Sequence, residues 1–184
     1  MIRIIIFILM LIISYLVGSI SSAHFICQKF YSIDIRKYGS GNPGATNVLR
    51  VLGTKPALVV FLADLLKGLI MVTIGRLVGG ENLALLAAIA VVVGHDWSIF
   101  LNFKGGKGIA TSFGVIIGVF PKVAPLLLII SIAVIYIWRY VSLGSITSAV
   151  FLPILLLIYR YPAKHVAVGL ILGAIAVYRH WDNI

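Results

Sequence analysis

Long apolar runs separated by short polar stretches make up most of this chain. The runs cover about Arg3–Phe25, Ala57–Val78, Leu83–Phe100, Ile109–Phe120, a segment ending at Trp138, Ile146–Tyr159 and His165–Tyr178. Runs of this kind are typical of helices that cross a membrane. Pro56 suits the first turn of the second run, and Gly79–Asn82 is expected to form the turn after it.

A pair of prolines decides how many spans the middle of the chain forms. Read as one helix, residues 109–138 would be about 45 Å long at about 1.5 Å per residue, which exceeds the roughly 30 Å core of a bilayer. Pro121 and Pro125 therefore favour a break or reversal. The pattern predicts an all-α polytopic membrane helix bundle with about seven transmembrane helices.

Basic residues divide unequally between the two sides of this predicted bundle. One side holds the polar stretches Gln28–Lys55, Asn102–Gly108, Arg139–Ser145 and Arg179–Ile184, with most of the lysines and arginines. The other side holds Arg3, Arg76, Lys122, Arg160 and Lys164. The positive-inside bias then places the polar stretches and the C-terminus in the cytoplasm and the N-terminus outside. One crossing fewer would separate these stretches.

Composition excludes an ordinary soluble domain, because 61% of the 184 residues are hydrophobic and 11% are charged. We expect residues 1–184 to form a single integral membrane domain. The net charge of +10 suits anionic lipids or an anionic substrate, whereas no basic helix or aromatic platform indicates nucleic acid. The single cysteine, Cys27, excludes an intrachain disulfide and a cysteine metal site. A cleaved signal peptide is not expected.

The stretch Gly39–Arg50 combines glycines with hydroxyl, amide and guanidinium groups between two apolar runs. Glycine lets a ligand approach the backbone closely, and this mixture of donors suits a phosphate ester. The candidate binding residues here are Arg36, Ser40, Asn42, Asn47 and Arg50. The alternative is a tight polar turn between two helices.

A second phosphate signal is Lys104, Gly105, Gly106, Lys107 and Gly108, directly before an apolar run. Free backbone amides, the positive end of a helix and two lysines all attract an anion. The alternative is a basic turn that binds lipid head groups. The stretch does not match a Walker loop, which disfavours nucleotide hydrolysis.

Histidines at the cytoplasmic edge are candidates for proton transfer or phosphate binding. His95 and His180 lie there, whereas His24 and His165 are interpreted as structural. Asp64 and Lys67 lie three residues apart in an apolar run, and we interpret them as a structural ion pair. No histidine or carboxylate spacing indicates a metal site, and no nucleophile elbow indicates an acyl-serine intermediate.

Several motifs together resemble the bacterial membrane acyl-phosphate:glycerol-3-phosphate acyltransferase family, over nearly the whole chain. They are Tyr15–Ile20, Asp34–Asn47, Gly94–Trp97, Phe103–Gly108 and Arg139–Leu143. Asp96-Trp97 departs from the family's more usual residues after the histidine, which we expect to be tolerated. The family's C-terminal motif runs past Asn183-Ile184, so one structural glutamate is expected to be missing.

This resemblance implies transfer of a fatty acyl group from acyl phosphate to the 1-hydroxyl of glycerol 3-phosphate, which gives lysophosphatidic acid and phosphate. It implies a multi-pass enzyme of the bacterial inner membrane that faces the cytoplasm, needs no metal or cofactor, contacts membrane lipids and acts as a monomer. The implied catalytic residues are His180, Ser40 and Arg36. The implied substrate-binding residues are Asn42, Asn47, Arg50, His95, Lys104, Gly105, Gly106, Lys107, Gly108, Ser142, Arg179 and Asn183.

Two other functions fit parts of the same pattern. A transporter of small phosphate esters would use the same basic stretches, although internal repeats and a site at the membrane midplane are typical of transporters. A lipid-binding scaffold would need only the basic turns. Release of phosphate that depends on glycerol 3-phosphate separates an enzyme from both.

Overall fold

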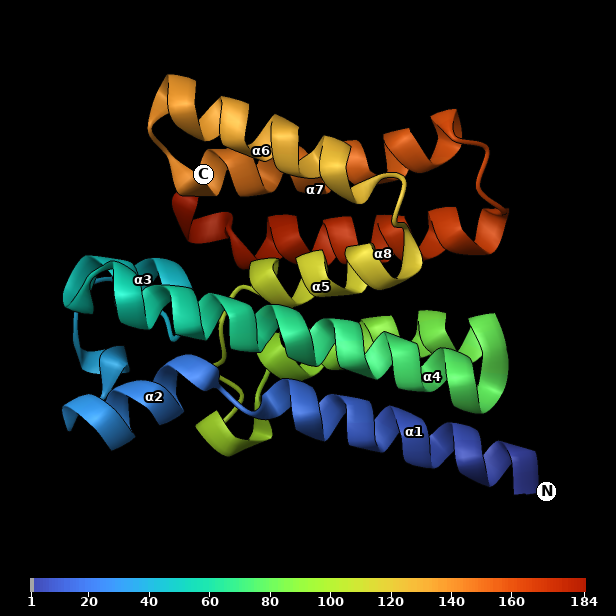
Figure 1. The fold of residues 1–184 in the computed structure, drawn as a ribbon, viewed down its shortest axis with the longest axis horizontal. Coiled ribbons are helices and arrows are strands. Elements are labelled where there is room, and N and C mark those ends of the chain that lie inside the picture. The colour runs from blue at the N-terminus through green and yellow to red at the C-terminus, as the bar shows by residue number, and fades with distance from the viewer. Residues whose placement is uncertain (1) are drawn as a thin grey trace. The chain divides into compact units, whose positions relative to one another are not determined.

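A computed structural model describes residues 2–184, and every regular element in that range is helical (Figure 1). The α-helices are α1 (Ile2–Ser19), α2 (Ser22–Tyr31), α3 (Ala45–Leu52), α4 (Thr54–Asp96), α5 (Ile109–Val119), α6 (Ala124–Trp138), α7 (Val141–Ile158) and α8 (Ala163–Arg179). Short 3₁₀ helices are η1 (Ile35–Lys37), η2 (Ile99–Leu101) and η3 (Trp181–Asn183). The predicted all-α class is confirmed.

The chain folds as two compact units, Met1–Val115 and Ile116–Ile184, and the boundary falls within α5. The first unit holds α1 to α4 and the first half of α5, and the second holds α6 to α8. The interpretation of residues 1–184 as a single domain stays a prediction.

The first apolar run is broken in two, which corrects the expectation of one span over Arg3–Phe25. Helix α1 ends at Ser19, and α2 begins at Ser22 after an extended Ser21. The Ser21 hydroxyl caps α2, because its Oγ accepts a hydrogen bond from the His24 amide at 3.2 Å. Small polar residues that cap a new helix thus outweigh the apolar pattern here.

Helix α4 is a hairpin of two antiparallel arms, residues 54–78 and 81–96. Gly79 and Gly80 leave the helical conformation between them, and Gly80 has φ +74°, a region that favours glycine. A Cβ placed on Gly75 would lie against the backbone of Ala84 across the turn. The predicted turn at Gly79–Asn82 is therefore confirmed.

Glycines set the closest helix contacts in the first unit. A Cβ on Gly18 of α1 would overlap the carbonyl oxygen of Val91, and a Cβ on Gly94 would overlap that of Tyr15. The α1 helix therefore packs directly on the second arm of α4. Close contacts at small residues are typical of membrane helix pairs.

The helix breaks at the predicted proline pair, where α5 ends at Val119 and α6 begins at Ala124. In the second unit α7 packs against both α6 and α8, and buried Phe120 contacts the rings of Tyr161 and His165. Helix α7 begins at Val141, which corrects the expected start at Ile146. The Ser145 hydroxyl donates back to the Val141 carbonyl at 3.0 Å, so this polar stretch is compatible with helix.

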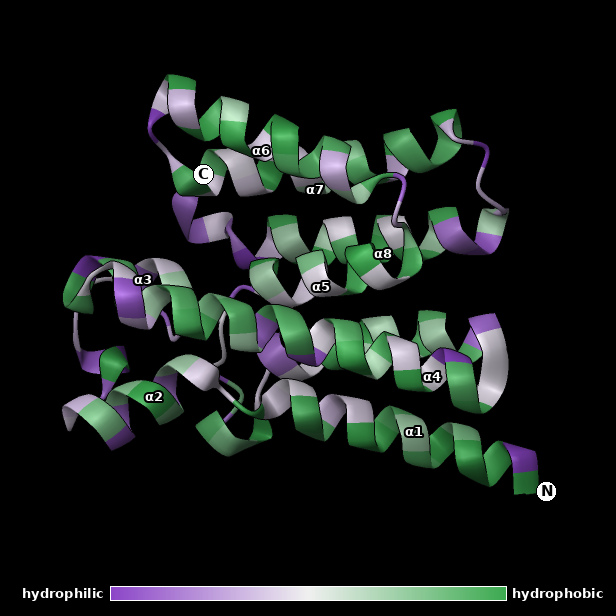
Figure 2. Ribbon diagram, viewed as in Figure 1, coloured by the Kyte–Doolittle hydropathy of each residue, from purple (hydrophilic) through white to green (hydrophobic). Residues whose placement is uncertain are grey.

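Three helices within residues 2–184 are long and apolar enough to cross a membrane: α1, α4 and α7. The shorter apolar helices are α5 and α6. Figure 2 shows α1 as apolar along most of its length, with polar residues gathered in the loops beside α3. The count of about seven spans stays a prediction.

Candidate functional site

Asp34 and Arg36 organise the start of the loop between α2 and α3. The Asp34 carboxylate accepts the Arg36 backbone amide at 3.1 Å and two bonds from its guanidinium at 2.9 and 2.8 Å. The Arg36 guanidinium holds the pKa of the Asp34 carboxyl well below its ordinary value of 3.8, and the same pairing raises the pKa of Arg36. Arg36 therefore remains cationic at the loop surface.

Asn47 fixes the shape of the predicted phosphate loop from within α3. Its amide nitrogen donates to the carbonyls of Ile35 at 3.3 Å and Tyr38 at 2.9 Å, and its oxygen accepts the Ser40 amide at 2.8 Å. Gly39 has φ +59°, and a Cβ there would overlap the Asn47 oxygen. The buried Asn47 thus positions Ser40, which is exposed at the loop surface together with Arg50.

The second predicted loop, Lys104–Gly108, is held against the end of α4. Gly105 donates its amide to the Asp96 carbonyl at 3.2 Å, and Gly106 donates to the His95 carbonyl at 3.0 Å. These bonds satisfy carbonyls that a helix end leaves open. They also correct one expectation, since the amides of Gly105 and Gly106 serve this packing and are not free for a phosphate.

Close packing explains the glycines of this loop. A Cβ on Gly105 would overlap the His95 carbonyl oxygen, and a Cβ on Gly106 would overlap His95 Nε2. Gly108 has φ +68° and lies against the Asp96 carboxylate. Lys104 is exposed and Lys107 is half-buried, so these side chains remain the loop's candidates for anion binding.

A buried polar cluster lies beneath this loop. The Lys67 ammonium contacts Asp64 Oδ1 at 2.8 Å, which confirms the predicted ion pair. It also contacts His95 Nδ1 at 2.8 Å and the carbonyls of Gly18 at 3.0 Å and Ile20 at 2.9 Å. All three side chains are at most 7% exposed. The ammonium thus joins the end of α1 to both arms of α4.

Sequence reasoning missed the contact between Lys67 and His95. The two residues are 28 positions apart, but they lie at comparable distances on either side of the Gly79–Gly80 turn. Folding the predicted hairpin about that turn would have brought them level. The available signal was therefore the position of the turn.

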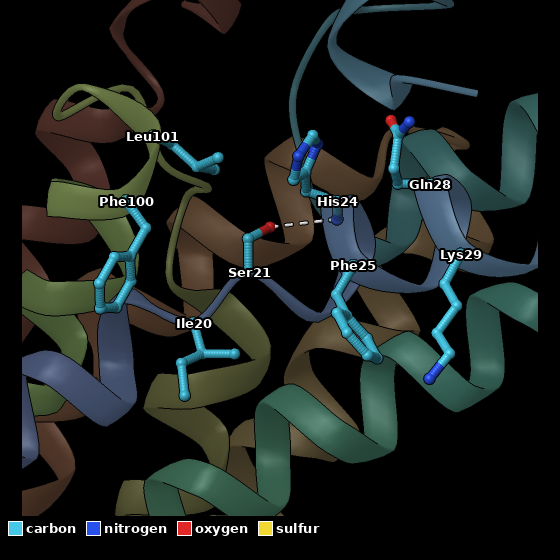
Figure 3. Close-up of a pocket in the computed structure, with 8 residues that line it drawn as sticks. All are labelled: Ile20, Ser21, His24, Phe25, Gln28, Lys29, Phe100 and Leu101. Carbon is cyan, nitrogen blue, oxygen red and sulfur yellow. Dashed lines mark hydrogen bonds between the residues drawn. The ribbon is translucent and has the colours of Figure 1, made fainter. Parts of the chain in front are cut away.

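An open groove lies between α2 and η2 in the first unit (Figure 3). Its volume is about 390 Å³, and its lining is Ile20, Ser21, His24, Phe25, Gln28, Lys29, Phe100 and Leu101. Figure 3 shows Phe25 and Lys29 extending to the same side of α2, where the Lys29 ammonium lies 5.4 Å from the Phe25 ring centre. None of the predicted site residues lines this groove.

In the second unit, the predicted residues gather at one end of the α7–α8 pair. Helices α7 and α8 follow one another in the chain and run antiparallel. They touch where a Cβ on Gly173 of α8 would contact the Ala149 carbonyl of α7. Ser142 lies as many residues before Ala149 as His180 lies after Gly173, so Ser142 and His180 are at the same height along the helix pair. Arg179 and Asn183 flank His180 at this end.

The His180 ring is buried, and its orientation is set by α8. Nδ1 lies 2.7 Å from the Ala176 carbonyl oxygen. A carbonyl only accepts, so Nδ1 carries the hydrogen and Nε2 of the neutral ring carries a lone pair. This arrangement suits a hydrogen-bond acceptor or a base.

The predicted site residues thus lie in three groups. Around the loops of the first unit lie Arg36, Ser40, Asn42, Asn47 and Arg50, and separately His95 with Lys104, Gly105, Gly106, Lys107 and Gly108. At the end of α7 and α8 lie Ser142, Arg179, His180 and Asn183.

Comparison with known proteins places this chain among membrane acyltransferases. The family model described as glycerol-3-phosphate acyltransferase matches residues 8–184. The glycerol-3-phosphate acyltransferase of Syntrophomonas wolfei is 46% identical over 95% of this chain and 90% of its own. That of Thermoanaerobacter pseudethanolicus is 49% identical over 94% of this chain and 87% of its own.

Solved structures agree with this relationship. The crystal structure of PlsY (YgiH), an integral membrane glycerol 3-phosphate acyltransferase in its glycerol 3-phosphate form, matches with a TM-score of 0.90 and 38% identity. The match covers 96% of this chain and 89% of that one. Its lysophosphatidic acid form matches with a TM-score of 0.89. This chain belongs to the glycerol-3-phosphate acyltransferase family and is an all-helical membrane protein.

Proposed function

We propose that this protein acylates the 1-hydroxyl of glycerol 3-phosphate with an acyl phosphate as donor, giving lysophosphatidic acid and inorganic phosphate. The observation that carries the proposal is the family match over residues 8–184. Relatives named glycerol-3-phosphate acyltransferase, and PlsY structures in glycerol 3-phosphate and lysophosphatidic acid forms, support the acceptor and the product.

The choice of donor comes from the resemblance to the acyl-phosphate-dependent family, and the chemistry is compatible with it. An acyl phosphate is an activated mixed anhydride, so the acceptor hydroxyl can attack its carbonyl carbon directly. The new ester C–O bond forms as the bond from the carbonyl carbon to the phosphate oxygen breaks, and the hydroxyl proton leaves with the phosphate or through a base. This scheme needs no covalent acyl-enzyme, in keeping with the missing nucleophile elbow in the sequence.

Each substrate carries a phosphate, and two groups of cationic and hydrogen-bonding residues are available for them. In the proposal, Arg36, Ser40, Lys104 and Lys107 stabilise the negative charge of the leaving phosphate. In the same proposal, glycerol phosphate is bound by His180, Asn183, Arg179 and Ser142. Asn47 shapes the first loop, and Asn42, Arg50 and His95 complete the binding surface.

His180 is the proposed base or clamp for the acceptor. The lone pair on Nε2, fixed by the bond between Nδ1 and the Ala176 carbonyl, supports either role. Single-turnover acylation by His180→Ala at saturating substrates separates the two. If His180 is a base, the rate should fall by more than about a hundredfold. A rate within a few-fold of the parent would exclude the base and leave a role in binding glycerol phosphate.

We also propose a topology for the reaction. The N-terminus lies outside, the C-terminus lies inside, and the polar loops face the cytoplasm of the bacterial inner membrane, where a monomer acts. The excess of lysine and arginine in those loops supports this orientation.

The proposed activity is tested with purified protein, acyl phosphate and glycerol 3-phosphate. Phosphate release that requires glycerol 3-phosphate, with matching formation of lysophosphatidic acid, is the expected result. Reconstituted vesicles provide the other arm, because uptake of glycerol 3-phosphate without release would indicate a transporter and would overturn the proposal.

A further inference from the structure

Lys67 lies in the first arm of α4, outside the loops and helix ends of the proposed site. Its ammonium is nevertheless in contact with His95 Nδ1, at 2.8 Å. The His95 ring joins the cluster to the Lys104–Gly108 loop, because its Nε2 lies against Gly106. Any constraint on this ring therefore reaches the loop directly.

The hydrogen-bond partners of Lys67 determine its protonation state. Lys67 Nζ has four partners: two carbonyl oxygens, which only accept, the Asp64 carboxylate and His95 Nδ1. The carbonyls and the carboxylate together require three hydrogens on Nζ. The nitrogen is therefore an ammonium without a lone pair. Its three hydrogens serve four contacts, so one N–H is shared between two acceptors, and toward Nδ1 the ammonium can act only as a donor.

His95 Nδ1 must then be an acceptor without hydrogen. The Asp64 Oδ1 atom lies 3.7 Å from Nδ1, too far for a hydrogen bond. The Asp64 oxygen instead accepts from Lys67 and from the Ser22 hydroxyl at 2.9 Å. The hydrogen of the neutral His95 ring therefore lies on Nε2, the nitrogen against Gly106.

We infer that Lys67, held in place by Asp64, is a positioning residue for His95: its ammonium selects the tautomer with hydrogen on Nε2 and so presents a donor at the Gly105–Gly106 turn. The other tautomer would put a lone pair at the same place, which repels the oxygens of a phosphate. The consequence for activity rests on the proposed function, whereas the tautomer itself does not.

The direct test is ¹⁵N NMR of the His95 ring in the purified protein, assigned by the loss of signals in His95→Gln. The expected spectrum has a protonated Nε2 and an unprotonated Nδ1. A protonated Nδ1 in the parent protein overturns the inference outright, and this readout does not need an active enzyme.

The causal role of Lys67 is tested with Lys67→Met, which keeps an apolar stem but removes the donor. We expect the ring to show both tautomers, and kcat/KM for glycerol 3-phosphate acylation to fall at least about tenfold. Lys122→Met, an exposed lysine in the turn before α6, is the matched control and should change neither. An unchanged His95 spectrum in Lys67→Met overturns the role of Lys67, while absence of activity in the parent would count against the proposed function alone.

Discussion

The Asn47 amide makes three hydrogen bonds to the loop before α3, and the residue is 1% exposed. We predict that Asn47→Ala lowers the free energy of unfolding by roughly 2–3 kcal/mol, because buried carbonyls lose their donors. Thermal unfolding in detergent measures the loss. Thr46→Ala, on the exposed neighbouring position, is the control, and equal stability of both variants would contradict the assigned role.

The ion pair of Asp34 and Arg36 predicts a dependence of stability on pH. Because the folded-state pKa of Asp34 lies below its ordinary value of 3.8, the pair stabilises the fold above that value, and the benefit is lost as the pH falls further. The stability difference between the parent and Asp34→Asn should be constant from about pH 8 to 5 and close below about pH 4.

Chemical unfolding at each pH provides this measurement, with the exposed Asp182→Asn as control. A stability difference that persists unchanged to the lowest pH would show that the Asp34 carboxylate charge is not responsible.

At the scale of helices, the contact between α1 and α4 depends on glycine. We predict that Gly18→Ala destabilises the protein by about 2 kcal/mol, because its Cβ would overlap the Val91 carbonyl oxygen and the helices must separate. Ile13→Ala, on an exposed position of the same helix, is the control. Thermal stability of Gly18→Ala equal to that of the parent would refute the close contact.

The sequence predicted the helix boundaries correctly where a glycine or a proline ends the helix. The turn at Gly79–Gly80 and the helix break near Pro121 appear as predicted. The break after Ser19 did not follow, since it depends on the Ser21 cap within an apolar segment. The start of α7 at Val141 did not follow either, because the polar residues there are compatible with both a loop and a helix. Residue type alone does not show which partner a serine hydroxyl finds.

The candidate site, like the helix boundaries, could be predicted from the sequence only in part. Residue types identified the two loops, but the contacts of Asn47, and the use of the Gly105 and Gly106 amides, arise from tertiary packing. Lys67 was correctly paired with Asp64, although its bond to His95 joins two arms of a hairpin. A pattern along one helix cannot show a partner on the other arm.

For the whole molecule, we predict opposite membrane sides for the two ends of α8. In a Cys27→Ser background, Lys164→Cys should react with an impermeant maleimide from outside intact cells, because the Lys164 side carries fewer basic residues. Asp182→Cys should react only after the cells are opened. The reverse labelling pattern, or labelling of both from one side, would contradict the proposed topology.

The central claim is acyl transfer from acyl phosphate to glycerol 3-phosphate, and quantifying both products in one reaction tests it most directly. Mass spectrometry of lysophosphatidic acid and a phosphate assay should give equal amounts from the purified protein, with neither product formed when glycerol 3-phosphate is left out. Phosphate without lysophosphatidic acid, or lysophosphatidic acid formed only from a thioester donor, would contradict the account.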